Sequence, residues 1–355
     1  MKRLLLLYVL FSGTAASAQL LPGNWRGVLQ LNDSVQLPFN FEMSAPGRPP
    51  TITIRNAEER IAVTEITATA DSVFWKMPVF DSEFRCSRKN PMLLQGVWIN
   101  HARKTSNHIP FTAYWGDTSR FKQPKQFVLN FSGRWKTTFS PGSEKDKTDA
   151  IGEFVQTGAM LTGTFLTETG DYRYLEGSGS ADSLLLSCFD GAHAFVFKAK
   201  FDMRHGYFTG GFWSGSHWYE PWQAYRDENA RLRDPEKLTF LIDSSKVVDF
   251  TFRNTEGELV SLHDKKYKGK PVIIQVMGSW CPNCMDETKT LAALYKKYNP
   301  KGLEIIALAY EKTNDSIKAR QVVTRLKKHY GVTYEMLITG KTGKDEASKS
   351  LPFLN

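Results

Sequence analysis

Short runs in which apolar and polar residues alternate fill the sequence from about residue 24 to residue 225. Examples are VQLPFNFEM, DSVFWKMPVF, QFVLNF and AFVFKAKF, and residues that favour turns separate them. A period of two places every second side chain on the same face of an extended strand, whereas an amphipathic helix needs a period near 3.6. No long segment of this region has a convincing helical period, so the pattern predicts an all-β region of many short strands.

Short motifs recur within this region at a spacing of about 110 residues. They are GNWRGVL and SGRWKTT around Trp25 and Trp135, DSVFW and DSLLL at Asp71 and Asp182, VFDS and CFDG at Asp81 and Asp190, and QGVWI and GGFWS at Gly96 and Gly211. Matches in the same order at nearly one spacing indicate an internal duplication. We therefore expect two β-rich repeats, at residues 19–120 and 121–225.

The pattern changes after residue 225. Residues 226–245 begin with the charged segment RDENARLRDPEK, which is helix-prone up to Pro235, and are predicted to form a linker. Strand-like and helix-like segments then alternate over residues 246–355. The predicted strands cover residues 247–253, 258–262, 271–277, 303–310 and 334–339, and the predicted helices cover residues 282–298 and 315–330. This order predicts an α/β domain in which helices cover a sheet with parallel strands.

The N-terminus has the three parts of a secretory signal peptide. Lys2 and Arg3 are basic, residues 4–11 are apolar, and small residues lead up to Ala18. We therefore expect a signal peptide over residues 1–18 and export to the periplasm or cell envelope. Its apolar core is shorter than the roughly 20 residues that cross a bilayer as a helix. The alternative is an uncleaved signal that tethers the chain to the membrane.

The formal net charge of +9 is concentrated in the C-terminal part of the chain. Its basic residues are spread along predicted helices and loops, without the interleaved aromatic side chains of a surface that binds single strands. We therefore expect a solvated basic face and no nucleic acid as a partner.

Two of the four cysteines, Cys281 and Cys284, are separated by two residues. Disulfides persist in exported proteins, but a loop this short adds little stability when it is closed. The spacing therefore favours a redox-active disulfide over a structural clip. A zinc site is the alternative, but the nearest candidate ligands, His263 and His329, stand alone in this domain, and we expect no metal or other cofactor.

The other cysteines, Cys86 and Cys188, fall in the β-rich region. They are interpreted as buried small residues or as one structural disulfide.

The segment VIIQVMGSWCPNCMDE places the cysteine pair where a buried strand turns into a helix. Unpaired backbone N–H groups and the helix dipole stabilise a thiolate at a helix N-terminus, so Cys281 is predicted to be the nucleophile. Cys284 lies one helical turn further on and can resolve a mixed disulfide at Cys281. Pro282 suits the first position of the helix and shapes the turn between the cysteines.

Two neighbouring residues complete the predicted site. Glu287 lies three residues after Cys284, where it can exchange a proton with that thiol, although a solvated helix residue is the alternative. Trp280 is expected to shield one side of the sulfurs, or else to belong to the core.

The stretch VDFTFRNTEGELVSLHDKKYKGKPVIIQVMGSWCPNCMDE resembles the TlpA/ResA-like exported thioredoxins of the redoxin group. The resemblance covers about residues 246–355 and does not extend to the β-rich region. It implies a thioredoxin-like fold, disulfide exchange with exported proteins, an antioxidant or repair role, and electrons supplied by a membrane thiol-disulfide donor. The β-rich region would add a ligand or partner of its own.

The sequence departs from the resemblance in two places. Gln275 stands where ordinary thioredoxins have a buried Asp, which would leave proton transfer to Glu287, as in the ResA-like branch. Family members continue past ASKSLPFLN with a strand led by a cis-proline, so we expect the thioredoxin-like domain to be truncated at Asn355.

Three functions follow as hypotheses. The first is an exported thiol-disulfide oxidoreductase that acts through Cys281 and Cys284. The second is a β-rich binding module with a vestigial redox domain. The third is a thiol peroxidase, which is disfavoured because Gly278 occupies the position three residues before Cys281 where a Thr would be expected.

Overall fold

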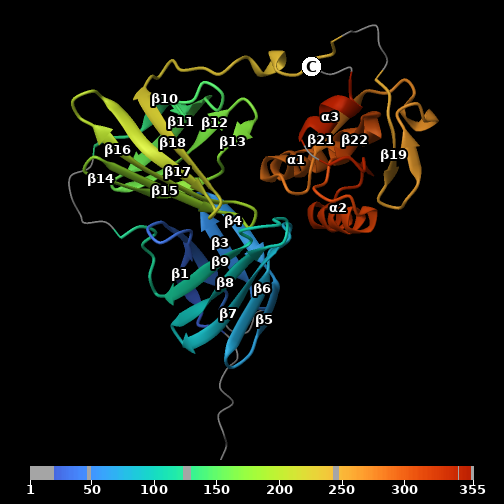
Figure 1. Ribbon diagram of the computed structural model, residues 1–355. Helices are drawn as coiled ribbons and strands as arrows, with labels where there is room; N and C mark the ends of the chain where they lie inside the picture. The colour runs from blue at the N-terminus through green and yellow to red at the C-terminus, as the bar shows by residue number, and fades with distance from the viewer. Residues whose placement is uncertain (1–19, 46–48, 123–128, 243–247, 343, 353–355) are drawn as a thin grey trace, which may run out of the picture.

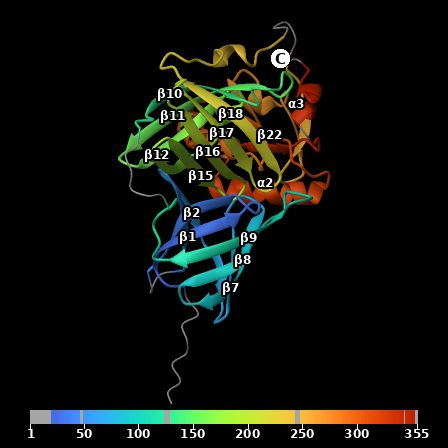
Figure 2. The same ribbon diagram turned by 60° about the vertical axis from the view of Figure 1, so that its left-hand side comes forward.

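The computed structural model describes residues 20–45, 49–122, 129–242, 248–342 and 344–352. The signal peptide predicted for residues 1–18 lies outside these ranges. Within them, no helix has both the length and the apolar character that crossing a membrane requires. The structure consists of two β-rich bodies and one α/β body, and the α/β body lies against both β-rich bodies (Figures 1 and 2).

The first β-rich body is a nine-stranded antiparallel sheet. Its strands are β1 (Gly23–Gln30), β2 (Gln36–Met43), β3 (Ile52–Asn56), β4 (Glu59–Val63), β5 (Glu65–Ala68), β6 (Ser72–Lys76), β7 (Ser82–Asn90), β8 (Leu93–Asn100) and β9 (His108–Trp115). The strand order is β4-β3-β2-β1-β9-β8-β7-β6-β5. Alternate side chains point inward and form an aromatic core, in which Trp75 stacks on Phe84 with ring centroids 4.5 Å apart.

The second β-rich body also has nine strands. They are β10 (Gly133–Phe139), β11 (Thr148–Thr157), β12 (Met160–Thr167), β13 (Gly170–Asp171), β14 (Leu175–Ser180), β15 (Ser183–Phe189), β16 (Ala194–Asp202), β17 (Tyr207–Ser214) and β18 (Trp218–Arg226). Pairing of β12 with both β11 and β14 closes the sheet into a barrel. Gly163 permits this closure, because a Cβ there would lie 2.0 Å from the Glu153 carbonyl oxygen.

The two sheets connect their strands in the same order. Each strand of the first sheet corresponds to the strand numbered nine higher in the second, so that β1 corresponds to β10 and β9 to β18. Trp25 and Trp135 occupy matching strands, and each indole Nε1 donates a 2.9 Å hydrogen bond to the carbonyl oxygen four residues earlier. The all-β character of this region is confirmed. The tandem duplication stays a prediction, since a shared strand order does not require a common origin.

The C-terminal body has a five-stranded sheet of order β20-β19-β23-β22-β21, and β21, β22 and β23 run parallel. Its elements are β19 (Thr251–Asn254), β20 (Leu259–Ser261), β21 (Val272–Met277), α1 (Pro282–Tyr298), β22 (Glu304–Ala309), α2 (Ser316–Tyr330), β23 (Glu335–Ile338) and α3 (Lys344–Ser350). Short 3-10 turns lie at Lys265–Tyr267 and Asn299–Lys301. The βαβαβ path with helices on the sheet is the expected thioredoxin-like arrangement.

The segment between β18 and β19 was expected to be helix-prone before Pro235. The residues described before Pro235 form no helix, and a 3-10 turn at Pro235–Lys237 instead begins at this proline and is capped by Asp234. The turn buries none of its residues. A short charged segment gains no packing energy that would offset the cost of nucleating a helix.

The C-terminal body contacts the ends of β-strands in both sheets. From α2, Arg325 donates a hydrogen bond of 2.9 Å to the carbonyl oxygen of Val79, which precedes β7. From α1, Asp286 forms an ion pair with Arg173 of the second β-rich body, which is called the second barrel below. These contacts bring the start of α1 close to loops that lie more than 90 residues earlier in the sequence.

Candidate active site

Cys281 lies at the junction between β21 and α1. It is the N-cap residue of α1, and its extended backbone, with φ of −105° and ψ of 107°, precedes Pro282 at the first helical position. The Cys281 sulfur accepts a hydrogen bond of 3.3 Å from the backbone N–H of Cys284. The turn before it requires Gly278, because a Cβ there would lie 2.9 Å from the Tyr310 carbonyl oxygen. The sulfur therefore takes the capping position of a serine or aspartate oxygen.

The two thiols have opposite acidities. The hydrogen bond from the Cys284 side chain is the largest cause that lowers the pKa of Cys281, and with backbone N–H groups it outweighs burial and brings that pKa to about 6. The same hydrogen bond, together with burial, raises the pKa of Cys284. Both cysteines are free, so the structure represents the dithiol form. At neutral pH this form holds a thiolate at Cys281 and a thiol at Cys284.

Glu287 is joined to the cysteine pair through Gln275. The buried Gln275 amide donates hydrogen bonds to Glu287 Oε2 at 3.0 Å and to the Cys284 carbonyl oxygen at 3.4 Å. Thr288 also contacts this amide, at 3.1 Å. Glu287 itself is exposed to solvent, and its charge contributes to the raised pKa of Cys284. The structure thus links Glu287 electrostatically to Cys284, while the buried amide fixes where its carboxylate lies.

Trp280 is held beside the cysteines by its polar edge. Its indole Nε1 donates a hydrogen bond of 2.8 Å to the Tyr310 carbonyl oxygen, and the Lys312 ammonium lies 4.1 Å from the ring centroid. The adjacent Ser279 donates two hydrogen bonds to the buried Glu311, one from its backbone and one from its hydroxyl. Burial raises the pKa of Glu311, and the hydrogen bonds from Ser279 oppose this shift. These contacts fix the turn that carries Cys281.

A cavity of about 820 Å³ opens between the β-rich bodies and Cys281. The C-terminal body contributes Trp280 and Cys281, the second barrel contributes Tyr172 and His193, and the first sheet contributes Lys104. This volume lies within the range of small-molecule sites. Access to Cys281 through this cavity therefore depends on side chains of all three bodies.

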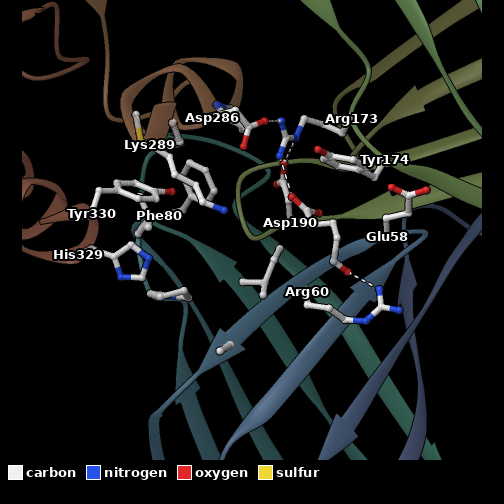
Figure 3. A pocket seen from close by; sticks show the side chains of 17 residues that line it. Glu58, Arg60, Phe80, Arg173, Tyr174, Asp190, Asp286, Lys289, His329 and Tyr330 are labelled. Carbon is white, nitrogen blue, oxygen red and sulfur yellow. Dashed lines mark hydrogen bonds and ion pairs between the residues drawn. The ribbon is translucent and has the colours of Figure 1, made fainter. Parts of the chain in front are cut away.

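Arg173 joins all three bodies at the edge of a second cavity, of about 800 Å³ (Figure 3). Its guanidinium lies 2.8 Å from Glu59 of β4, 3.2 Å from Asp190 after β15 and 2.5 Å from Asp286 of α1. Burial opposes its charge, but Asp190, Asp286 and Glu59 together raise the pKa of Arg173. Burial likewise opposes the charge of Asp190, yet His193 and Arg173 lower its pKa to about 2.

The β13 turn contacts Asn283, one of the two residues between the cysteines. Asn283 lies within hydrogen-bonding reach of Asp171, and a Cβ at Gly170 would clash with the Asn283 amide. Arg173, two residues later, has a positive φ of 66°. This left-handed backbone is unusual for an arginine.

The sequence brings Cys281, Cys284, Glu287, Trp280 and Pro282 together because all of them fall within eight consecutive residues. It gave no sign that Asp171, Arg173 or His193 would lie near them. In the sequence, Asp190 stands out only as part of the repeated VFDS/CFDG motif.

Cys86 and Cys188 are buried in β7 and β15 and are free. Burial raises the pKa of Cys86 to about 12 and raises that of Cys188 well above its ordinary value. The alternative of a structural disulfide between them is therefore wrong. Each fills a small apolar space in the core of its own sheet.

The C-terminal region of the chain is similar in sequence to known proteins. Residues 244–344 match the model of the AhpC/TSA family. The thiol-disulfide oxidoreductase ResA of Bacillus thuringiensis is 39% identical over 70 residues, which are 20% of this chain and 39% of that protein. A probable glutathione peroxidase 2 of Arabidopsis thaliana is 33% identical over 101 residues, which are 27% of this chain and 59% of that protein.

Among solved structures, the crystal structure of StoA from Bacillus subtilis is similar over 28% of this chain and 69% of that chain, with 24% identity and a TM-score of 0.22. The chain spans less than half of the length of the ResA protein that it matches. The C-terminal region of the chain is thus similar to the AhpC/TSA family and to the thiol-disulfide oxidoreductase ResA.

Proposed function

We propose that this chain is a thiol-disulfide oxidoreductase in which Cys281 is the nucleophile and Cys284 the resolving thiol. One observation carries the proposal. The Cys281 sulfur caps α1 and accepts the N–H of Cys284, and its pKa is lowered to about 6 while that of Cys284 is raised. This asymmetry is what an attacking thiolate and a waiting thiol require.

The exchange runs in two steps. The Cys281 thiolate attacks one sulfur of a substrate disulfide, so that a bond between Cys281 and the substrate forms as the substrate S–S bond breaks. The departing sulfur keeps the bonding electron pair and takes a proton from solvent. Cys284 then loses its proton and attacks Cys281, which releases the second substrate sulfur and leaves a Cys281–Cys284 disulfide. Two electrons pass to the substrate, and an external thiol donor must restore them.

Glu287 is the proposed acceptor for the proton of Cys284. As the Cys284 sulfur becomes a nucleophile, its proton must leave a site where burial disfavours the thiolate. Glu287 lies one turn along α1, and its carboxylate is fixed by the Gln275 amide. Gln275 carries no ionisable group, so it cannot take the proton that a buried Asp at this position would accept.

Exported proteins with disulfides are the proposed substrates, and a membrane thiol-disulfide donor is the proposed source of electrons. Both follow from the TlpA/ResA-like character of the domain together with the signal peptide predicted for residues 1–18. We place the protein in the periplasm or cell envelope on the same grounds. The β-rich region, whose loops line the cavity over Cys281, would select the partners that reach the thiolate.

A thiol peroxidase is the second candidate, and the similarity to a probable glutathione peroxidase favours it. In that reaction the Cys281 thiolate would attack a peroxide oxygen, so that an S–O bond forms as the O–O bond breaks, and the other oxygen would leave as an alcohol or as water. Cys284 would then attack the Cys281 sulfenic acid, which forms the disulfide and releases water. Peroxide consumption by the reduced protein separates the two candidates. Consumption that is fast, alongside a failure to reduce insulin, would favour the peroxidase.

Trapping of mixed disulfides tests the proposal. Cys284→Ser leaves the attack intact but removes the resolving thiol, so covalent adducts should accumulate at Cys281. Cys281→Ser is the matched variant, and it should trap far fewer adducts because Cys284 lacks an acidic thiol. Insulin reduction by the unaltered chain measures turnover in parallel. If Cys284→Ser traps no partner and the unaltered chain does not reduce insulin, the proposal is wrong and a binding role for the β-rich region takes its place.

A further inference from the structure

Two hairpins of the second barrel carry the same Asp-x-x-His sequence. Asp190 and His193 lie between β15 and β16, whereas Asp202 is the last residue of β16 and His205 lies in the turn before β17. In each hairpin one Asp oxygen accepts the backbone N–H groups two and three residues on, and the other lies near Nδ1 of the His, at 3.2 Å for His193 and 2.8 Å for His205. In both hairpins the Asp-x-x-His sequence thus stabilises the turn between two strands.

The two hairpins have different surroundings. The His205 side chain is 66% exposed, whereas that of His193 is 28% exposed and its ring stacks on Phe195 with centroids 4.4 Å apart. Asp190 is buried and also paired with Arg173. His193 is therefore held in place by a buried carboxylate on one side and an aromatic ring on another, while the equivalent pair at His205 faces solvent.

His193 lines the same cavity as Cys281. Because Asp190 forms a hydrogen bond with Nδ1 of His193, Nε2 is the ring nitrogen that is left to interact with groups in the cavity. We propose that His193 is a positioning residue of the thiol site, supplied by the β-rich region, and that its imidazolium stabilises the Cys281 thiolate across the domain boundary. The inference rests on the proposed role of Cys281 as the nucleophile and adds a residue from outside the thioredoxin-like domain.

Electrostatics supports this geometry. The charge of His193 is among the causes that lower the pKa of Cys281. The other charged groups around the cavity come from several elements: Asp81, His101, Arg103 and Lys104 from the first sheet, Asp171 from β13, and Glu311, Lys312 and Lys318 from the C-terminal body. Asp81 lies 3.8 Å from Lys318, and Glu311 binds Ser279.

The test compares His193→Gln with His205→Gln, its counterpart in the matched hairpin. The alkylation rate of Cys281 by iodoacetamide is measured against pH in the full chain, with the modified cysteine located by mass mapping. His193→Gln should move the midpoint to higher pH and slow alkylation below it by about threefold, since an opposite charge near a thiolate favours ionisation. His205→Gln should match the unaltered chain.

A third variant separates charge from shape. His193→Arg keeps a permanent cation and should leave the low pH midpoint of Cys281 alkylation in place. If the role of His193 were purely structural, both His193→Gln and His193→Arg should raise this midpoint. An unchanged midpoint in His193→Gln, or an equal shift in His205→Gln, overturns the inference. Insulin reduction by the unaltered chain and adduct trapping by Cys284→Ser report separately on Cys281 as nucleophile. If those succeed while the His193→Gln midpoint is unchanged, this inference alone fails.

Discussion

The cysteines of the β-rich region and those of the C-terminal region differ in chemistry although the residue is the same. Cys86 and Cys188 are buried within strands, and burial raises the pKa of both. Cys281 begins a helix, and its pKa is lowered to about 6. All of them are free thiols, so the contrast arises from their surroundings and not from oxidation.

The backbone explains most of this difference. Within a sheet, neighbouring strands already bind the N–H groups, so a buried thiolate would find few donors to replace water. The first turn of a helix leaves N–H groups without partners, and Cys281 receives one of them from Cys284. A reactive cysteine is thus recognised by its position at a helix start, and the two β-strand cysteines serve as matched controls.

The largest expected effect comes from removing the proposed nucleophile. Cys281→Ser should reduce insulin reduction by about a thousandfold, because the covalent step is lost. Cys188→Ala should leave the rate unchanged and lower the free energy of unfolding by about 1 kcal/mol, since it opens a small cavity in the core. A large loss of rate in Cys188→Ala, in protein that is still folded, would contradict the division between the two regions.

The contact between the regions is tested at Arg173. Arg173→Ala should lower the free energy of unfolding in urea by about 3 kcal/mol, because it leaves the carboxylate of Asp190 buried without this partner. Arg233→Ala is the control, since Arg233 forms a similarly short ion pair with Glu168 on the surface and should lower the free energy of unfolding much less. Equal losses of unfolding free energy in the two variants would show that burial of the Arg173 ion pairs adds nothing to stability.

A substitution at Glu287 separates proton transfer from Cys284 and ionisation of Cys281 within the C-terminal region. Glu287→Gln keeps the side-chain shape but cannot accept a proton, so insulin reduction should slow by about a hundredfold. Alkylation of Cys281 should continue at its original rate, because that sulfur is already a thiolate. An unchanged rate of insulin reduction would return Glu287 to the role of a solvated helix residue.

The sequence predicted those parts of the molecule that depend on local pattern. Alternation revealed the β-rich region, and the candidate site could be assembled because residues 280–287 follow one another along a single turn and helix. The interface could not be predicted, because Arg173 and His193 lie about 90 residues or more before the cysteines and meet them only through docking of separate bodies. Periodicity reports which face of an element is buried, but not what another body places against it.

The most direct test of the central claim is the pH dependence of alkylation at each cysteine of the reduced chain. Mass mapping after limited reaction with iodoacetamide should show Cys281 modified first, with a midpoint near pH 6, as its lowered pKa requires. Cys284 should react far more slowly, and Cys86 and Cys188 should stay unmodified while the protein is folded. A Cys281 midpoint near the ordinary thiol value, or modification of Cys284 before Cys281, would contradict the account.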